Sequence, residues 1–421
     1  NFGSSAQVVT ETHRQHCRVA QIVLMAAMLT QVLDSTQVAP SGGCTCDRHP
    51  AAGSSPYPRR RRACGAHVSS RVVVALAVAA ATVTAVAEDD GVYSFPMSNY
   101  KNVQYFLEVD VGTPPQKLRL ALATTIADMS TNLEGKGANS GYDPAASSSS
   151  LNMSQEVANA SLFQDNISIG DLEFENFTFL AEKGANYSEG LGLPSVPFQG
   201  DGYFGFAFAA YMKENTGPGM PALIQGLADS GKLKEPTFAI YFGDDSPGEI
   251  MFGGVNPQRY IGGFNYVDTF HPYTSGPTWL MPLSQFKVDN EVMDLGSPAS
   301  CVVEVHSVVY GPEHEVGAIS SKLNATREDD LYVVPCSRSV SLTFTINGID
   351  YVLDQDDLLR EARSDGSCVL ALGTYVSARW GTWSLGAPFM RKFYTQFDVG
   401  RQRMGIAHAA RAAGRRLTVL V

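Results

Sequence analysis

The sequence predicts an all-β fold with a few short helices, and three observations lead to this prediction. Residues 105–111 and 117–123 alternate apolar and polar side chains, as half-buried strands do. The Gly-Thr-Pro-Pro segment at 112–115 between them has the composition of a tight turn. Asn347-Gly348 separates two apolar runs, which is the strongest short-range hairpin signal. Helical patterns are confined to 220–231 and 356–363.

The first 87 residues differ in composition from the rest of the chain. Residues 59–87 contain a run of four arginines, an apolar run from Val72 to Val83 and the small-x-small sequence Ala-Val-Ala at 85–87. This order is typical of a secretory signal peptide that is cleaved after Ala87. An uncleaved signal anchor is the alternative, although the apolar run is short for a membrane span. Residues 1–58 form an upstream segment of unclear status.

Two later segments resemble each other and a known family. VGTPPQKLRLALATT begins at Val111 and CVVEVHSVVYGP begins at Cys301. Both resemble the active-site strands of pepsin-family aspartic peptidases, which end in hydrophobic-hydrophobic-Asp-Thr-Gly. The stretches 201–208, 240–267 and 383–398 resemble other framework motifs of that family. The resemblance implies a bilobal pepsin-like fold with a central cleft, an N-terminal lobe at 88–270, a C-terminal lobe at 271–407 and a tail at 408–421.

The two aspartates of that family are absent. In this alignment the family's catalytic positions hold Ala123 and Val303, and the glycines that follow are Thr125 and Val305. Aspartic peptidases need two carboxylates that share one proton, so that one acts as acid and the other as base. Ala123 and Val303 have no titratable group. The sequence therefore predicts no catalytic residue at either position.

Two nearby carboxylates are candidates to replace the missing ones. Glu304 lies one residue after Val303, and Asp128 lies five residues after Ala123. A shift of one residue along a strand turns the side chain to the opposite face. Glu304 and Asp128 are therefore expected to be solvated or locally hydrogen-bonded loop residues. The alternative is a bulge that turns Glu304 back toward the site as a substitute catalytic residue.

In that family, a hairpin called the flap carries a Tyr-Gly-Ser/Thr-Gly tip, and this motif is missing from the corresponding region of this sequence. Residues 151–161, LNMSQEVANAS, contain neither Tyr nor Gly. We expect a shortened or absent flap, and hence less exclusion of water from the site.

Six Asn-x-Ser/Thr sequons, none with Pro between, are candidate glycosylation sites. They begin at Asn152, Asn159, Asn166, Asn176, Asn186 and Asn324. Five of them precede residue 187, beside the region of the missing flap. Either glycans crowd the edge of the former cleft, or this is an exposed polar region without a special role.

Three cysteines remain after residue 87. The resemblance places Cys336 and Cys368 where the family has its second-lobe disulfide, which an oxidising compartment permits. Cys301 is left over. It is either a buried apolar thiol on an inner strand or a partner for another chain.

Charge and motif content exclude several classes of function. After the first 87 residues the chain carries 23 basic and 39 acidic residues, a net charge of −16. This disfavours nucleic-acid and anionic-membrane partners. His306 and His314 are eight residues apart without nearby Cys, so they do not form a metal-ligand pattern. We expect no metal and no cofactor.

These observations predict a secreted pepsin-family homologue that is proteolytically inactive. We expect a monomer that binds an extended peptide or a protein in the cleft between its lobes, as a scaffold or a decoy, with no membrane attachment after signal cleavage. The alternative is an active aspartic endopeptidase that uses a displaced carboxylate.

Overall fold

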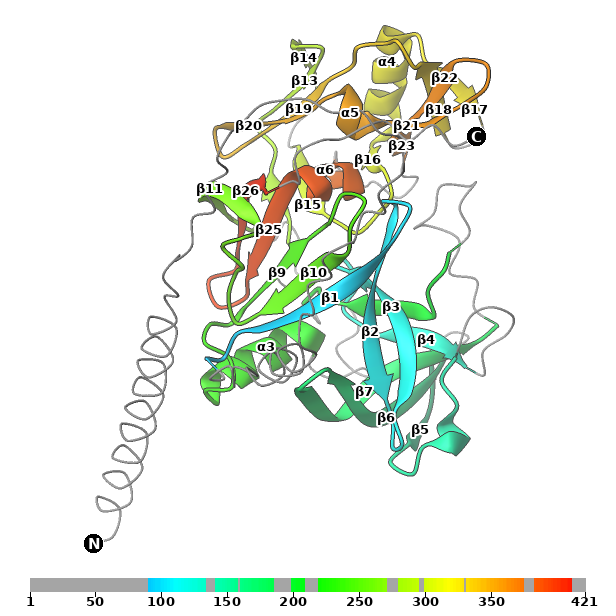
Figure 1. The fold of residues 1–421 in the computed structure, drawn as a ribbon, viewed down its shortest axis with the longest axis vertical. Helices are drawn as coiled ribbons and strands as arrows, with labels where there is room; N and C mark the ends of the chain where they lie inside the picture. The colour runs from blue at the N-terminus through cyan, green and yellow to red at the C-terminus, as the bar shows by residue number, and fades with distance from the viewer. Residues whose placement is uncertain are drawn as a thin grey trace, which may run out of the picture. The chain divides into compact units, whose positions relative to one another are not determined.

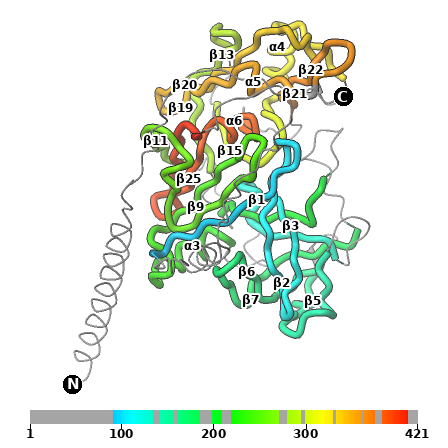
Figure 2. The backbone as a smooth tube through the Cα atoms, in the orientation of Figure 1, coloured from blue at the N-terminus to red at the C-terminus, as the bar shows by residue number. Residues whose placement is uncertain are grey.

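A computed structural model describes residues 90–133, 141–157, 160–184, 198–208, 219–270, 279–294, 299–328, 331–374 and 382–410 (Figures 1 and 2). The chain from Ala85 onward forms one compact unit. The upstream segment, the signal peptide, Asn159 and Asn186 all lie outside the described residues.

Thirteen of the described strands form one large sheet. Its order is β11-β26-β25-β9-β10-β1-β2-β3-β8-β4-β7-β6-β5. In chain order these strands are β1 (Tyr93–Tyr100), β2 (Gln104–Val111), β3 (Gln116–Ala123), β4 (Ser130–Leu133), β5 (Leu151–Val157), β6 (Ala160–Ile169), β7 (Leu172–Lys183), β8 (Gly202–Gly205), β9 (Thr237–Tyr241), β10 (Gly248–Phe252), β11 (Tyr260–Asp268), β25 (Phe393–Asp398) and β26 (Arg403–Ala409).

An additional pairing closes part of this sheet on itself. β2 pairs with β3 along most of its length, and its last residues, Asp110 and Val111, also pair with Ser168 and Ile167 of β6. The circuit β2-β3-β8-β4-β7-β6 therefore returns to β2. Closure gives these strands a shared interior, and the side chains that alternate inward along β2, β3 and β6 fill it.

Three smaller sheets follow in the second half of the chain, and their strands occupy the residues between β11 and β25. The first sheet contains β12 (Met281–Pro282), β15 (Ser300–Val303), β16 (Val309–Gly311), β23 (Leu372–Thr374) and β24 (Thr382–Leu385). The second contains β13 (Gln285–Val288), β14 (Glu291–Met293), β19 (Leu342–Ile346) and β20 (Ile349–Leu353). The third contains β17 (Thr326–Glu328), β18 (Leu331–Pro335), β21 (Leu359–Ala362) and β22 (Ser367–Leu370).

Helices are few and short, as the sequence predicts. In the described residues they are η1 (Pro144–Ala146), α3 (Gly219–Asp229), α4 (Glu313–Leu323), α5 (Gln355–Leu358) and α6 (Ala387–Lys392). The all-β fold class is confirmed. The helix expected at 356–363 is wrong beyond its first turn, because residues from Leu359 onward pair with β22 as strand β21. The Asn347-Gly348 hairpin is confirmed, with both residues at positive φ between β19 and β20.

The C-terminal strands pair with strands from the middle of the chain in the large sheet. β25 pairs with β9, and β26 pairs with β25 and with β11 (Figure 2, red beside green). Phe397 of β25 stacks on Phe238 of β9 with ring centroids 4.5 Å apart, and Trp279 packs edge-on against both rings. The core therefore runs continuously between the halves. The lobe boundary at 270/271 and the tail at 408–421 stay predictions.

A buried arginine strengthens the same junction. The side chain of Arg391, in α6, is fully buried, and its Nη1 donates to the carbonyl oxygen of Asn102, between β1 and β2, at 2.5 Å. Its Nε lies 3.6 Å from a carboxylate oxygen of Asp244, which follows β9. Tyr105 stacks on Phe242 beside this pair, and its hydroxyl donates to the carbonyl oxygen of Gly243. Arg391 thus ties the last helix to two turns of the first half.

Candidate functional site

The first half of the site is the end of β3. The last four residues of β3 are buried, and β3 runs parallel to β8, with Ala123 opposite Gly205. The chain after Ala123 folds back over β8, where the amide of Ala207 donates to the carbonyl oxygen of Ile126 at 3.0 Å. A Cβ on Gly205 would lie 2.5 Å from backbone atoms of Ala127 and Ile126, so this position has no room for a larger residue.

The second half repeats this arrangement. β15 ends at Val303 and runs parallel to β24, with Val303 opposite Leu385. Here too the residue three positions beyond the strand end accepts a hydrogen bond, since the amide of Ala387 donates to the carbonyl oxygen of His306 at 2.6 Å. A Cβ on Gly386 would lie 2.1 Å from the carbonyl oxygen of Val308. The chain therefore builds the same strand-loop-strand element twice.

The two strand ends meet at Thr124. Its hydroxyl donates to the carbonyl oxygen of Val303 at 2.5 Å, and its amide donates to Oε1 of Glu304 at 3.1 Å. The amide of Val305 donates to the same Oε1 at 3.0 Å. Thr124 and Glu304 are almost completely buried. The predicted site positions, Ala123 and Val303, are thus brought together, and hydrogen bonds link the two halves directly beside them.

Glu304 is expected from the sequence to be a solvated or a locally hydrogen-bonded loop residue. It is buried, and one carboxylate oxygen accepts two backbone amides, one of them from the other half of the chain. The other oxygen, Oε2, has no hydrogen-bond partner among the described residues. The carboxylate of Glu304 interacts electrostatically with Tyr203 of β8. Burial raises the pKa of the Tyr203 hydroxyl, and the negative charge of Glu304 raises it further. Of the two expected environments, the solvated one is therefore wrong, whereas the hydrogen bond from Val305 agrees with the locally hydrogen-bonded one.

Sequence reasoning missed the structural role of Thr124. The signal was present, because Thr124 is the one residue of the Asp-Thr-Gly triplet that this chain keeps in its first motif. Its hydroxyl and amide make the bonds described above, which need neither Asp nor Gly.

A family model described as eukaryotic aspartyl protease matches residues 104–409. The chain belongs to this family. It is 28% identical to pregnancy-associated glycoprotein 2 of Bos taurus over 340 residues, which cover 76% of this chain and 86% of the relative. It is 23% identical to a renin of Echis ocellatus (74% and 82% covered) and 26% identical to pepsin-3 of Oryctolagus cuniculus (76% and 85% covered).

A hairpin lies in the region where the sequence predicts the family's flap to be shortened or absent. β5 and β6 pair from Leu151↔Gln164 up to Val157↔Ala160, so only two residues connect them. The register is irregular between Asn152 and Glu156, and Ser154 has a positive φ of 55°. The first strand of this hairpin therefore contains a bulge.

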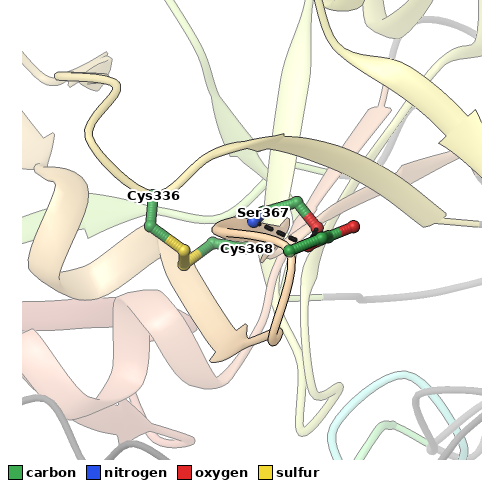
Figure 3. The surroundings of a disulfide bond; sticks show 4 residues. Cys336, Ser367 and Cys368 are labelled. Carbon is green, nitrogen blue, oxygen red and sulfur yellow. Dashed lines mark hydrogen bonds between the residues drawn. A yellow bond between two sulfur atoms is a disulfide. The ribbon is translucent and has the colours of Figure 1, made fainter.

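The cysteines follow the family pattern. Cys336 and Cys368 form a disulfide with their Cα atoms 4.9 Å apart, which ties the residue after β18 to β22 (Figure 3). Cys301 lies on β15 and is a buried free thiol, and burial raises its pKa. Its burial favours the interpretation as a packing residue over pairing with another chain.

The sequon asparagines that the structure describes differ in exposure. Asn152, Asn176 and Asn324 are exposed, whereas Asn166 is half-buried and its Oδ1 accepts a hydrogen bond from the amide of Asn176 at 3.1 Å. In the described part of the chain, no group of His, Cys, Asp and Glu side chains could hold a metal ion. Within the same residues, no helix is both long and apolar enough to span a bilayer.

Proposed function

We propose that this chain is a catalytically inactive member of the aspartyl protease family that binds an extended peptide or protein segment. The observation that carries the proposal is the meeting of the two strand ends with Ala123 and Val303 at the positions of the family's aspartates. Water activation in this family needs two carboxylates that share one proton. Neither Ala123 nor Val303 can accept or donate a proton, so the site lacks its acid and its base.

Glu304 does not supply the missing chemistry in this proposal. Its Oε1 accepts hydrogen bonds from the backbone amides of Thr124 and Val305. Within the described residues, none of its hydrogen bonds is to a second carboxylate. In this proposal Glu304 stabilises the junction between the two strand ends. A single carboxylate cannot serve as both the general acid and the general base.

An active endopeptidase that uses Glu304 as a displaced carboxylate is the second candidate function. The observation in its favour is Oε2 of Glu304, a buried carboxylate oxygen without a hydrogen-bond partner among the described residues. The isosteric variant Glu304→Gln separates the two functions, because an amide cannot act as a general base. Cleavage that the wild-type protein shows and Glu304→Gln lacks would support the second candidate.

Binding without cleavage follows from what the family does with its site. Aspartic peptidases hold peptide substrates in a cleft, and an extended peptide pairs its backbone with strands while side chains select the sequence. Ile126 lies on the loop three residues after Ala123 and is 46% exposed. We therefore assign Ile126 to the surface that contacts a bound peptide. A scaffold or decoy role would use this binding directly.

The binding test uses an exposed residue, so that folding is preserved. Ile126→Arg is compared with Val292→Arg, which changes another exposed apolar residue, on β14 of a smaller sheet. Fluorescence polarisation with a library of extended peptides should show that the wild-type protein binds some of them. Ile126→Arg should weaken this affinity at least about tenfold, or about 1.4 kcal/mol, and Val292→Arg should leave it unchanged. Equal binding by both variants, or no binding by the wild-type protein, would contradict the proposal.

We also propose that the mature protein is a secreted, glycosylated monomer that begins at Glu88. Support comes from the signal-like segment 59–87, the sequons and the Cys336–Cys368 disulfide, which suits an oxidising compartment. Expression of the full chain in a secretory eukaryotic cell should release protein into the medium with Glu88 at its N-terminus. Membrane-bound protein that retains Val72 to Val83 would support the signal-anchor alternative instead.

A further inference from the structure

Strand β5 is an edge strand of the large sheet in the part of the chain that the structure describes. It is the last strand in the sheet order, and its only ladder in the described residues is with β6. The unpaired backbone of an edge strand is a template for another strand, particularly where apolar side chains flank it. Leu151 is 54% exposed and Met153 is 41% exposed, and both lie on this edge. β5 thus combines an open backbone with two exposed apolar residues.

Asn152 stands between these two residues and begins a sequon. Its Oδ1 accepts a hydrogen bond from the amide of Ser154 at 2.8 Å, which fixes the side-chain amide in a local turn. This turn coincides with the bulge at Ser154. Nδ2, the atom that carries an N-linked glycan, has no hydrogen-bond partner among the described residues, and Asn152 is exposed.

We propose that an N-linked glycan on Asn152 covers the edge of β5 and prevents it from pairing with β5 of a second copy of this chain. The inference rests on the secretory part of the proposed function. The glycan comes from a polyprenyl-pyrophosphate-linked oligosaccharide. A bond forms between Nδ2 and the anomeric carbon of the first sugar, the bond from that carbon to the pyrophosphate breaks, and Nδ2 loses one proton.

The position distinguishes Asn152 from the other described sequons. Asn166 and Asn176 lie on or beside β6 and β7, which are paired on both sides, and Asn324 caps the end of α4. Only at Asn152 does a sequon occupy an edge strand between two exposed apolar side chains in the described structure.

Ser154→Ala removes the sequon and keeps Asn152, and Thr326→Ala is the matched control because it removes the exposed sequon of Asn324. Full-length proteins are expressed in secretory eukaryotic cells, and glycan occupancy is read by mass spectrometry after enzymatic deglycosylation in heavy-oxygen water. Oligomeric state is read by light scattering during gel filtration over a range of concentrations. We expect occupied Asn152 and a monomer for the wild-type protein and the control, and a mass approaching twice the monomer for Ser154→Ala.

A second variant tests the route of association. In the Ser154→Ala background, Leu151→Thr with Met153→Thr should restore the monomer, since it removes the apolar flanks of the edge. Unoccupied Asn152 with glycans at Asn176 or Asn324 would overturn this inference and leave secretion intact. Absence of glycans from every sequon would contradict the secretory proposal itself. The inference would also be overturned if the wild-type protein carries a glycan on Asn152 but the Ser154→Ala variant, which lacks it, is still a monomer.

Discussion

Thr124 and Glu304 are hydrogen-bonded across the two halves of the molecule, from the amide of one to the carboxylate of the other, 3.1 Å apart. The sequence places them in the two segments that end in a catalytic triplet in related proteins, yet neither lies at a catalytic position. The pair joins the two halves directly beside Ala123 and Val303, where the proposed function places the family's acid and base.

The Thr124–Glu304 junction predicts a graded response to substitution at Glu304. Glu304→Ala leaves the buried amides of Thr124 and Val305 without an acceptor, which should lower the free energy of unfolding by about 2 to 4 kcal/mol. Glu304→Gln keeps a carbonyl oxygen for both amides and should lose less than about 1.5 kcal/mol. Urea denaturation of the mature protein measures both. An alanine variant as stable as wild type would show that these hydrogen bonds do not hold the halves together.

Arg391 should be far more important to stability than an exposed arginine. Arg391→Met leaves Asp244 without its buried partner and the carbonyl of Asn102 without its donor, and should lower the free energy of unfolding by about 3 to 5 kcal/mol. Arg363→Met is the control, because it breaks an exposed ion pair with Glu328 that contributes about 1 kcal/mol or less. Similar losses for the two variants in thermal or urea denaturation would argue against Arg391 as a tie between the halves.

The thiol of Cys301 should be unreactive in the folded protein. It is buried, and burial raises its pKa, so little thiolate forms near neutral pH. A thiol-reactive dye should label the native mature protein negligibly and label one thiol per chain in denaturant without reductant, since Cys336 and Cys368 are bonded to each other. Cys301→Ala should show none in either condition. Rapid labelling of the native protein would contradict this assignment.

One surface carboxylate gives a prediction for acid pH. Hydrogen bonds from Lys287 and then Thr345 lower the pKa of Asp350 below its ordinary value of 3.8. The stabilisation is present above 3.8 and is lost as the pH falls through the lower native pKa. Asp350→Asn should therefore make the free energy of unfolding slightly less dependent on pH below about 4. Because Asp350 is largely exposed, the change should be small, and an unchanged slope in acid denaturation would reject it.

Much of the fold was predictable because its signals are local. Alternation in β2 and β3 and the Asn347-Gly348 turn specify strands and a hairpin from neighbouring residues alone. The environment of Glu304 was not predictable in this way. It depends on the amide of Thr124, 180 positions earlier in the chain, and strand alternation says nothing about such a partner. Likewise, the helical pattern at 356–363 ended early because pairing with β22 overrode local propensity.

The proposed loss of proteolysis is tested most directly by incubating the purified mature protein, from Glu88 onward, with denatured haemoglobin, with and without pepstatin. The incubations cover about pH 2 to pH 7, because this range spans the titration of carboxyl groups and histidine. Pepsin serves as the positive control. The absence of Asp at positions 123 and 303 predicts no cleavage at any pH, even with the protein in excess over substrate. Pepstatin-sensitive cleavage that disappears in Glu304→Gln would contradict it, and would show that a displaced carboxylate has restored the chemistry.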